Sequence, residues 1–106
     1  MRGKTIDLHL FDGFNLIIVQ ETHSQNSPKS SSIQATVNGH YLSVVFTANM
    51  GQVTVMVTDA NVTEIDSATC YTPNSVGFYI PNAGSYIVTF SFADGDSYYG
   101  EFEIMD

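Results

Sequence analysis

The stretch from Asn82 to Ile104 constrains the fold most, because its alternation admits only one β-hairpin register. Apolar and polar side chains alternate on both sides of Asp94-Gly95, which is the period of a half-buried strand. A two-residue Asp94-Gly95 turn would put glutamates on the apolar face. A three-residue loop, Ala93-Asp94-Gly95, instead gives Gly95 the left-handed position that such a loop needs. This register predicts the pairs Phe90–Tyr98, Val88–Gly100 and Tyr86–Phe102, with Tyr99, Glu101 and Glu103 outside. Gly100 opposite Val88 is expected to leave room for a neighbouring aromatic ring.

Further turn signals recur about every ten residues and delimit short strands. Asn38-Gly39 predicts a two-residue turn between Ile33 and Phe46, which would pair Val37 with His40, Ala35 with Leu42 and Ile33 with Val44. Residues 53–58 alternate regularly, and no window shows sustained helical spacing. The fold class expected is all-β, an immunoglobulin-like antiparallel β-sandwich of about seven to nine strands.

We expect residues 1–106 to form one domain with three parts. Residues 1–20 are expected as an N-terminal hairpin or arm that turns at Asp12-Gly13 and pairs Ile6 with Val19 and Leu8 with Ile17. Residues 21–32 are polar and are expected as a linker, and residues 33–106 as the sandwich core. The apolar arm is a candidate for partner binding or self-association.

The chain is acidic, with a formal net charge of −8, and Arg2, Lys4 and Lys29 are its only basic residues apart from histidine. Nucleic acid and anionic membrane surfaces require basic patches, so we expect neither as a partner. We also expect no membrane span and see no signal peptide. If the protein is exported, this sequence would be a mature or truncated form. The single cysteine, Cys70, excludes an internal disulfide and is interpreted as a small hydrophobic residue.

Gly84-Ser85-Tyr86 matches the tyrosine corner of immunoglobulin-like domains, in which a buried tyrosine donates a hydrogen bond to upstream backbone. We therefore assign Gly84 and Tyr86 a structural role. An antibody-type domain is excluded, because the chain has one cysteine and no tryptophan.

Several of these segments together resemble a family of small exported proteins from gut bacteria of the Bacteroides group, catalogued as a domain of unknown function. They are residues 32–39, residues 53–61, Gly84-Ser85-Tyr86 and residues 98–104, so that the resemblance covers about Ile33 to Ile104. It implies an immunoglobulin-like sandwich and export to the periplasm or cell surface, and it supplies no catalytic residues.

No constellation in the sequence indicates a metal, a cofactor or an enzyme. Asp94-Gly95-Asp96 with Glu101 or Glu103 offers too few oxygens for calcium, and turn chemistry explains the two aspartates. The histidines, His9, His23 and His40, have no metal-ligand spacing.

Outward-facing tyrosines are the best indication of binding, because exposed phenol rings stack on sugars or anchor protein interfaces. The candidates are Tyr41, Tyr99 and Tyr79; cross-strand pairing that stabilises the sheet is the competing interpretation. Asp66-Ser67-Ala68 resembles the acceptor pattern for O-glycosylation of exported Bacteroides proteins, which makes Ser67 a candidate for modification.

These observations favour a non-enzymatic exported module that contacts a protein or a glycan at the cell envelope. Two alternatives stay open at this point: a structural or self-associating envelope protein, and an accessory carbohydrate-binding module.

Overall fold

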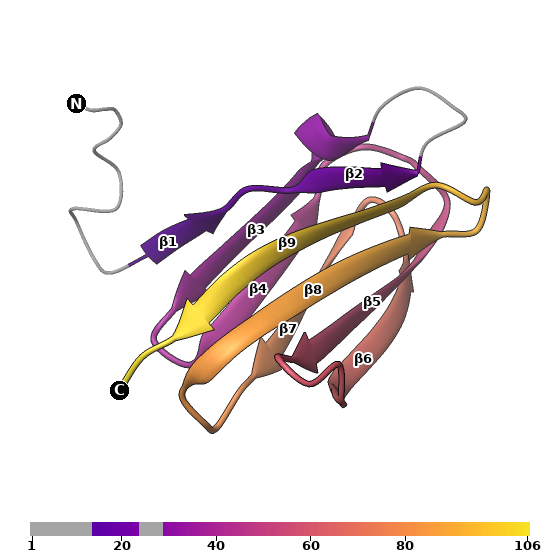
Figure 1. The fold of residues 1–106 in the computed structure, drawn as a ribbon. Helices are drawn as coiled ribbons and strands as arrows, with labels where there is room; N and C mark the ends of the chain where they lie inside the picture. The colour runs from indigo at the N-terminus through magenta and orange to yellow at the C-terminus, as the bar shows by residue number, and fades with distance from the viewer. Residues whose placement is uncertain (1–13, 24–28) are drawn as a thin grey trace.

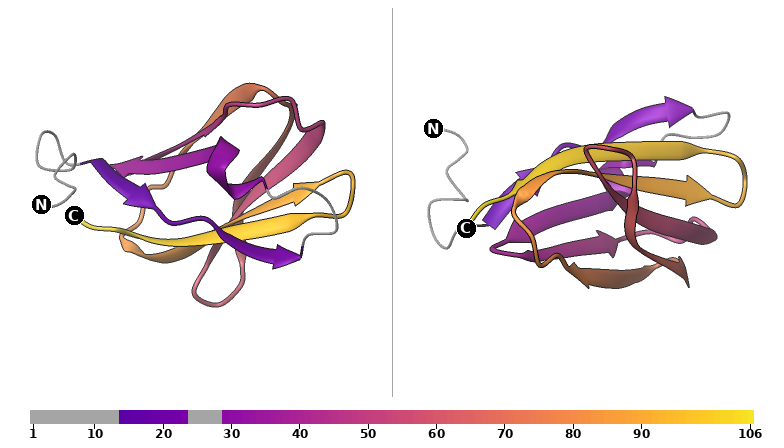
Figure 2. Two further views of the ribbon diagram at one scale, coloured as in Figure 1. Left: turned by 90° about the horizontal axis from the view of Figure 1, so that it is seen from above. Right: turned by 60° about the horizontal axis from the view of Figure 1, so that its bottom comes forward.

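The computed structural model describes residues 14–23 and 29–106, which form two antiparallel sheets packed face to face (Figures 1 and 2). A short 3₁₀ helix, Ser30–Ser32, precedes β3. The strands in this part of the chain are β1 (Phe14–Ile17), β2 (Gln20–His23), β3 (Ile33–Asn38), β4 (Tyr41–Phe46), β5 (Gln52–Asp59), β6 (Glu64–Tyr71), β7 (Asn74–Tyr79), β8 (Gly84–Phe92) and β9 (Ser97–Ile104).

The four-stranded sheet has the order β1-β3-β4-β7, and the five-stranded sheet has the order β2-β9-β8-β5-β6. β1 and β2 follow each other in the chain but belong to different sheets, so the chain crosses from one layer to the other between Ile17 and Gln20 (Figure 1). The expected fold class, an all-β immunoglobulin-like sandwich, is confirmed.

The core lies between the sheets and is built from the alternate residues of each strand, as a two-layer sandwich requires. Val53, Val55 and Val57 of β5 are fully buried, which confirms the face expected from their alternation. The other fully buried or nearly buried apolar residues include Ala35, Leu42, Val44, Phe46, Ile80, Val88, Phe90, Tyr98 and Ile104.

The register predicted for the closing hairpin is confirmed. Phe90 faces Tyr98, Val88 faces Gly100 and Tyr86 faces Phe102. Gly95 has a φ of +100°, and its N–H donates to the carbonyl of Phe92 at 3.0 Å, so the three-residue loop forms with glycine in the left-handed region.

Gly100 has a different role from the one its position opposite Val88 suggested. A Cβ at residue 100 would collide with the side chain of Ile17, which enters the core from β1. The space above Gly100 is therefore filled by an aliphatic side chain of the N-terminal strand, not by a neighbouring aromatic ring.

The hairpin between β3 and β4 corrects the predicted register. Asn38 faces Tyr41 and Val37 faces Leu42, so the two turn residues are Gly39 and His40 instead of Asn38 and Gly39. Gly39 has a φ of +63° at the first central position, as type II′ turns require. Moving the turn by one residue shifts the pairing by two, so every side chain keeps its predicted face.

The N-terminal part is only partly described, because Ile6, Leu8 and the Asp12-Gly13 turn lie outside the described residues. Ile17 pairs with Ala35 of β3. The range expected as a linker, 21–32, contains most of β2, which pairs with β9, and also the buried Lys29. The sandwich thus extends into this range.

Candidate functional site

Tyr41 and Tyr79 lie directly opposite each other on neighbouring strands of the four-stranded sheet. Both point away from the core, with 48% of Tyr41 and 65% of Tyr79 exposed. Local sequence patterns do not pair them, because β4 and β7 are far apart in the chain. Their pairing follows from the β4–β7 ladder, and it brings two isolated candidates onto one surface.

Gly77 explains how the ring of Tyr41 lies against the sheet. A Cβ at residue 77 would overlap the phenol oxygen and the adjoining ring carbon of Tyr41. The ring therefore extends over the backbone of β7 in the space that glycine leaves. Aromatic rings that cover a strand glycine in this way stabilise the sheet, so Tyr41 has a structural role as well as an exposed surface.

Tyr79 is supported by His40, whose ring stacks on it with centroids 6.0 Å apart and planes 29° apart. Both nitrogens of His40 meet acceptors: Nδ1 lies 2.7 Å from the carbonyl of Ile80, and Nε2 lies 2.7 Å from Oδ1 of Asp106. These two hydrogen bonds raise the pKa of His40, because only the imidazolium can donate from both nitrogens. The bond to the Ile80 carbonyl has the larger effect, and the bond to Asp106 follows.

We call the outward side of β3, β4 and β7 the tyrosine face. The three strands contain no Asp, Glu, Lys or Arg, although the chain carries a net charge of −8. Amides, hydroxyls and one valine surround the two rings. The members of the face are Gln34, Thr36, Asn38, Tyr41, Ser43, Val45, Ser75, Gly77 and Tyr79.

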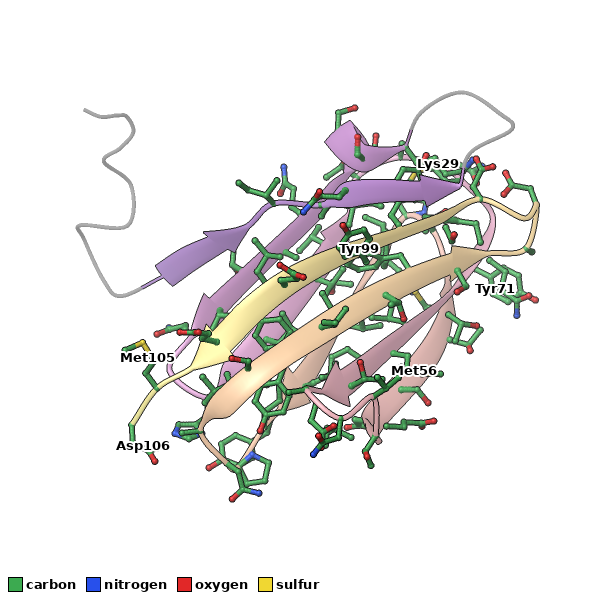
Figure 3. All side chains as sticks on the ribbon, viewed as in Figure 1. Lys29, Met56, Tyr71, Tyr99, Met105 and Asp106 are labelled. Carbon is green, nitrogen blue, oxygen red and sulfur yellow. The ribbon has the colours of Figure 1, made fainter. Side chains whose placement is uncertain are left out.

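The third candidate tyrosine lies elsewhere. Tyr99 is half-buried on the outer side of β9, between Thr89 and Gln20 in the five-stranded sheet (Figure 3). The structure therefore brings Tyr41 and Tyr79 together and places Tyr99 on the opposite side of the sandwich.

Ser67 is exposed on β6, where it faces Met56 of β5. Its N–H donates to the side chain of Asp66 at 2.8 Å.

Cys70 also lies on β6, half-buried against the core, and burial raises the pKa of its thiol. Such a thiol is less nucleophilic, as its interpretation as a hydrophobic residue requires.

Asp94 and Asp96 bind a lysine that the sequence did not point to. The ammonium of Lys29 lies 2.8 Å from Asp94 Oδ2 and 2.6 Å from Asp96 Oδ2, and 5.4 Å from the ring centre of Phe92. The backbone N–H of Lys29 donates to the hydroxyl of Tyr98 at 2.9 Å. Both Lys29 and Asp96 are buried, so the segment before β3 is fixed to the closing hairpin; we call this contact the Lys29 clamp.

The charges of the Lys29 clamp support each other. Hydrogen bonds to Asp94 and Asp96 raise the pKa of Lys29, and the hydrogen bond from Lys29 lowers the pKa of Asp94. The only sequence signal for the clamp was that Lys29 is one of three basic residues in an acidic chain. The aspartates therefore serve a buried ion pair in addition to the turn.

Tyr86 forms the tyrosine corner expected from Gly84-Ser85-Tyr86. Its hydroxyl donates to the carbonyl of Asn82 at 2.7 Å, and its ring stacks on Phe102 with centroids 5.7 Å apart. The role of this tyrosine is thus internal, and it adds nothing to the exposed aromatic surface.

A groove of about 370 Å³ opens on the outer side of the five-stranded sheet, where the β5–β6 turn meets β8 and β9. We call it the acidic groove. It is lined by Ala60, Ser85, Tyr86, Ile87, Glu101, Phe102 and Glu103.

Within residues 14–23 and 29–106, no three His, Cys, Asp or Glu side chains are grouped so that they could hold a metal ion. In the same part of the chain, no helix has the length and apolar character needed to cross a membrane.

No protein-family model and no curated protein matches the chain. Among solved structures, it is similar to a DUF3244 family protein with an immunoglobulin-like β-sandwich fold from Bacteroides vulgatus. The TM-score is 0.71 over 87% of this chain and 99% of that one, at 13% sequence identity. This likeness concerns the fold. It agrees with the resemblance, noted from the sequence, to small immunoglobulin-like proteins of unknown function from the Bacteroides group.

Proposed function

We propose that this chain is a non-enzymatic, exported binding module that contacts a neutral glycan at the cell envelope through the tyrosine face. The observation that carries the proposal is the pair Tyr41 and Tyr79, exposed side by side on strands that contain no Asp, Glu, Lys or Arg. Aromatic rings offer apolar faces to sugar rings, and the surrounding amides and hydroxyls can exchange hydrogen bonds with sugar hydroxyls.

The lack of charged residues on the three strands favours a neutral ligand. His40, which stacks on Tyr79, is already paired with Asp106. Binding a charged group on this face would therefore desolvate it without providing an unpaired opposite charge, which costs free energy. A neutral sugar avoids this cost. Both rings are also exposed, as a chain-like ligand lying across β4 and β7 requires.

The composition supports export, because Ser, Thr and Asn supply much of the polar surface in place of charged residues. Ser67 is exposed on β6, so a glycan transferase could reach its hydroxyl. Intact-mass analysis of the protein purified from its source should show a mass above that of the polypeptide, and the excess should disappear in Ser67→Ala.

Binding should be tested by affinity electrophoresis in gels that contain neutral polysaccharides. The wild type should be retarded, and Tyr41→Ala and Tyr79→Ala should each weaken binding about tenfold, equivalent to about 1.4 kcal/mol. Tyr99→Ala is the matched control, since it removes a tyrosine from the opposite sheet. Equal retardation of all four proteins, or retardation of none of them, would contradict the proposal.

A self-associating envelope protein is the alternative from another functional class, with residues 1–20 as the contact. Ile17 belongs to the core, so deletion of these residues would destabilise the fold whether or not they mediate association. Light scattering on the full chain is the better test, because a mass that stays monomeric at high concentration would exclude this alternative.

A further inference from the structure

The acidic groove is a concave surface with a chemistry unlike that of the tyrosine face. Ile87 forms part of its lining, lying between Glu101 of β9 and Thr58 of β5 in the sheet. Tyr86 and Phe102 are also among the lining residues, although both are mostly buried. The groove therefore offers contact to an aliphatic or aromatic group as well as to a polar one.

Two carboxylates from one strand line the groove. Glu101 and Glu103 are two residues apart on β9, so both point to the same side, with their Cα atoms about 7 Å apart. Ser85 lies opposite Glu103, and its hydroxyl donates to Glu103 Oε2 at 3.4 Å. A cation that lies between the two glutamates and has several N–H donors can form hydrogen bonds to both carboxylates.

Neither carboxylate has a cation within the described part of the chain. The ammonium of Lys29 is held by Asp94 and Asp96, and the imidazole of His40 is held by Asp106 and Ile80. Among the side chains that the structure describes, none neutralises the two glutamates, and the net charge of the chain is −8. A cationic partner would gain from both the local pair and the field of the whole molecule.

We propose that the acidic groove binds a lysine or arginine side chain presented by a partner protein. The aliphatic stem of such a side chain would lie on Ile87, and its charged end would reach Glu101 and Glu103. Long basic side chains commonly bury their stems in this way while the head remains paired. The volume of about 370 Å³ lies at the small end of ligand sites, which suits one side chain better than a large cofactor.

The acidic groove is structurally independent of the surface proposed to bind a glycan. The tyrosine face belongs to β3, β4 and β7 of one sheet, and the glutamates belong to β9 of the other. The module would then contact a glycan on one side and a basic protein on the other, and variants on either side leave the opposite side intact.

Titration followed by amide chemical shifts tests the assignment. The probes are N-acetyl-arginine methylamide, the neutral N-acetyl-norleucine methylamide, and an arginine-rich hexapeptide. The arginine probe should shift Ser85, Ile87, Glu101 and Glu103, and the effect should weaken at high salt. The neutral probe should bind at least fivefold more weakly, and the peptide at least fivefold more tightly than the single residue.

Single-charge variants provide the control. Glu101→Gln and Glu103→Gln should each weaken binding of the hexapeptide at least fivefold, whereas Asp66→Asn, which removes an exposed charge from β6, should not. Three results would each overturn the proposal: equal binding of the neutral probe, an equal loss in Asp66→Asn, or a peptide that binds no more tightly than the single arginine.

Discussion

At the scale of single residues, Tyr86 shows how a local motif became a specific contact. Its ring is buried and its hydroxyl donates to the carbonyl of Asn82. Tyr86→Phe keeps the ring and removes one buried hydrogen bond, so we expect a loss of about 1 kcal/mol in the free energy of unfolding. Urea denaturation checks this, with Tyr99→Phe as the control on a half-buried ring. An unchanged midpoint in Tyr86→Phe would show that the bond adds nothing.

Val62 is strained, because it has a φ of +62° in the turn between β5 and β6. β-Branched residues avoid this region, and the side chain gains little from burial, since 78% of it is exposed. Val62→Gly should therefore raise the free energy of unfolding by about 1 kcal/mol. Ala60→Gly, in the same turn but with negative φ, should lower it. If thermal melts show Val62→Gly to be destabilising, the turn does not have this geometry.

The ionisation of His40 makes the stability of the fold depend on pH, and the direction of its pKa shift gives the sign of this dependence. Its pKa is raised by the Ile80 carbonyl and Asp106, so the folded protein favours the imidazolium. The stabilisation is full below the unfolded pKa of about 6.5 and is lost as the pH rises through the higher folded value. Denaturation midpoints measured across neutral pH should fall more steeply in the wild type than in His40→Gln. Parallel curves would rule out the contribution.

At the scale of elements, the Lys29 clamp joins the segment before β3 to the β8–β9 loop. Lys29→Met keeps the length of the side chain but leaves the buried carboxylate of Asp96 without the ammonium. Breaking a buried ion pair costs about 3–5 kcal/mol. Asp94 is 39% exposed, so Asp94→Asn should cost much less. Chemical denaturation of both variants measures the difference, and equal losses would contradict the dominant role of Asp96.

The same clamp should respond to acid. Lys29 lowers the pKa of Asp94, so ionised Asp94 stabilises the folded protein. This stabilisation is fully present above the unfolded pKa of about 3.9 and is lost as the pH falls through the lower folded pKa. The loss of stability on acidification should therefore be steeper in the wild type than in Asp94→Asn.

Hairpins were the elements that the sequence predicted best, because their registers depend on local parity and turn chemistry. The closing hairpin was predicted pair by pair. The Asn38-Gly39 turn was placed one residue too early, yet Tyr41 kept its predicted face. Contacts between distant elements left no such local trace. The Tyr41–Tyr79 pair depends on β4–β7 pairing, and the Lys29 clamp joins residues 65 and 67 positions apart.

At the scale of the whole molecule, the regular turn spacing was enough to predict the sandwich, but the assignment of strands to sheets was not predictable. That assignment decides which surface residues meet. It separates Tyr99 from Tyr41 and Tyr79, and it places the uncharged tyrosine face on one layer and Glu101 and Glu103 on the other. The two sides of the sandwich thus differ in charge, and we propose that they differ in ligand.

The location of glycan binding tests the central claim most directly. A neutral oligosaccharide from whichever polysaccharide retards the protein should be titrated into the labelled chain, with amide shifts recorded residue by residue. The largest shifts should fall on Asn38, Tyr41, Ser43, Gly77 and Tyr79, across β3, β4 and β7. Shifts concentrated around Tyr99, or around Ser85 and Glu103 in the acidic groove, would show that the tyrosine face is not the recognition surface.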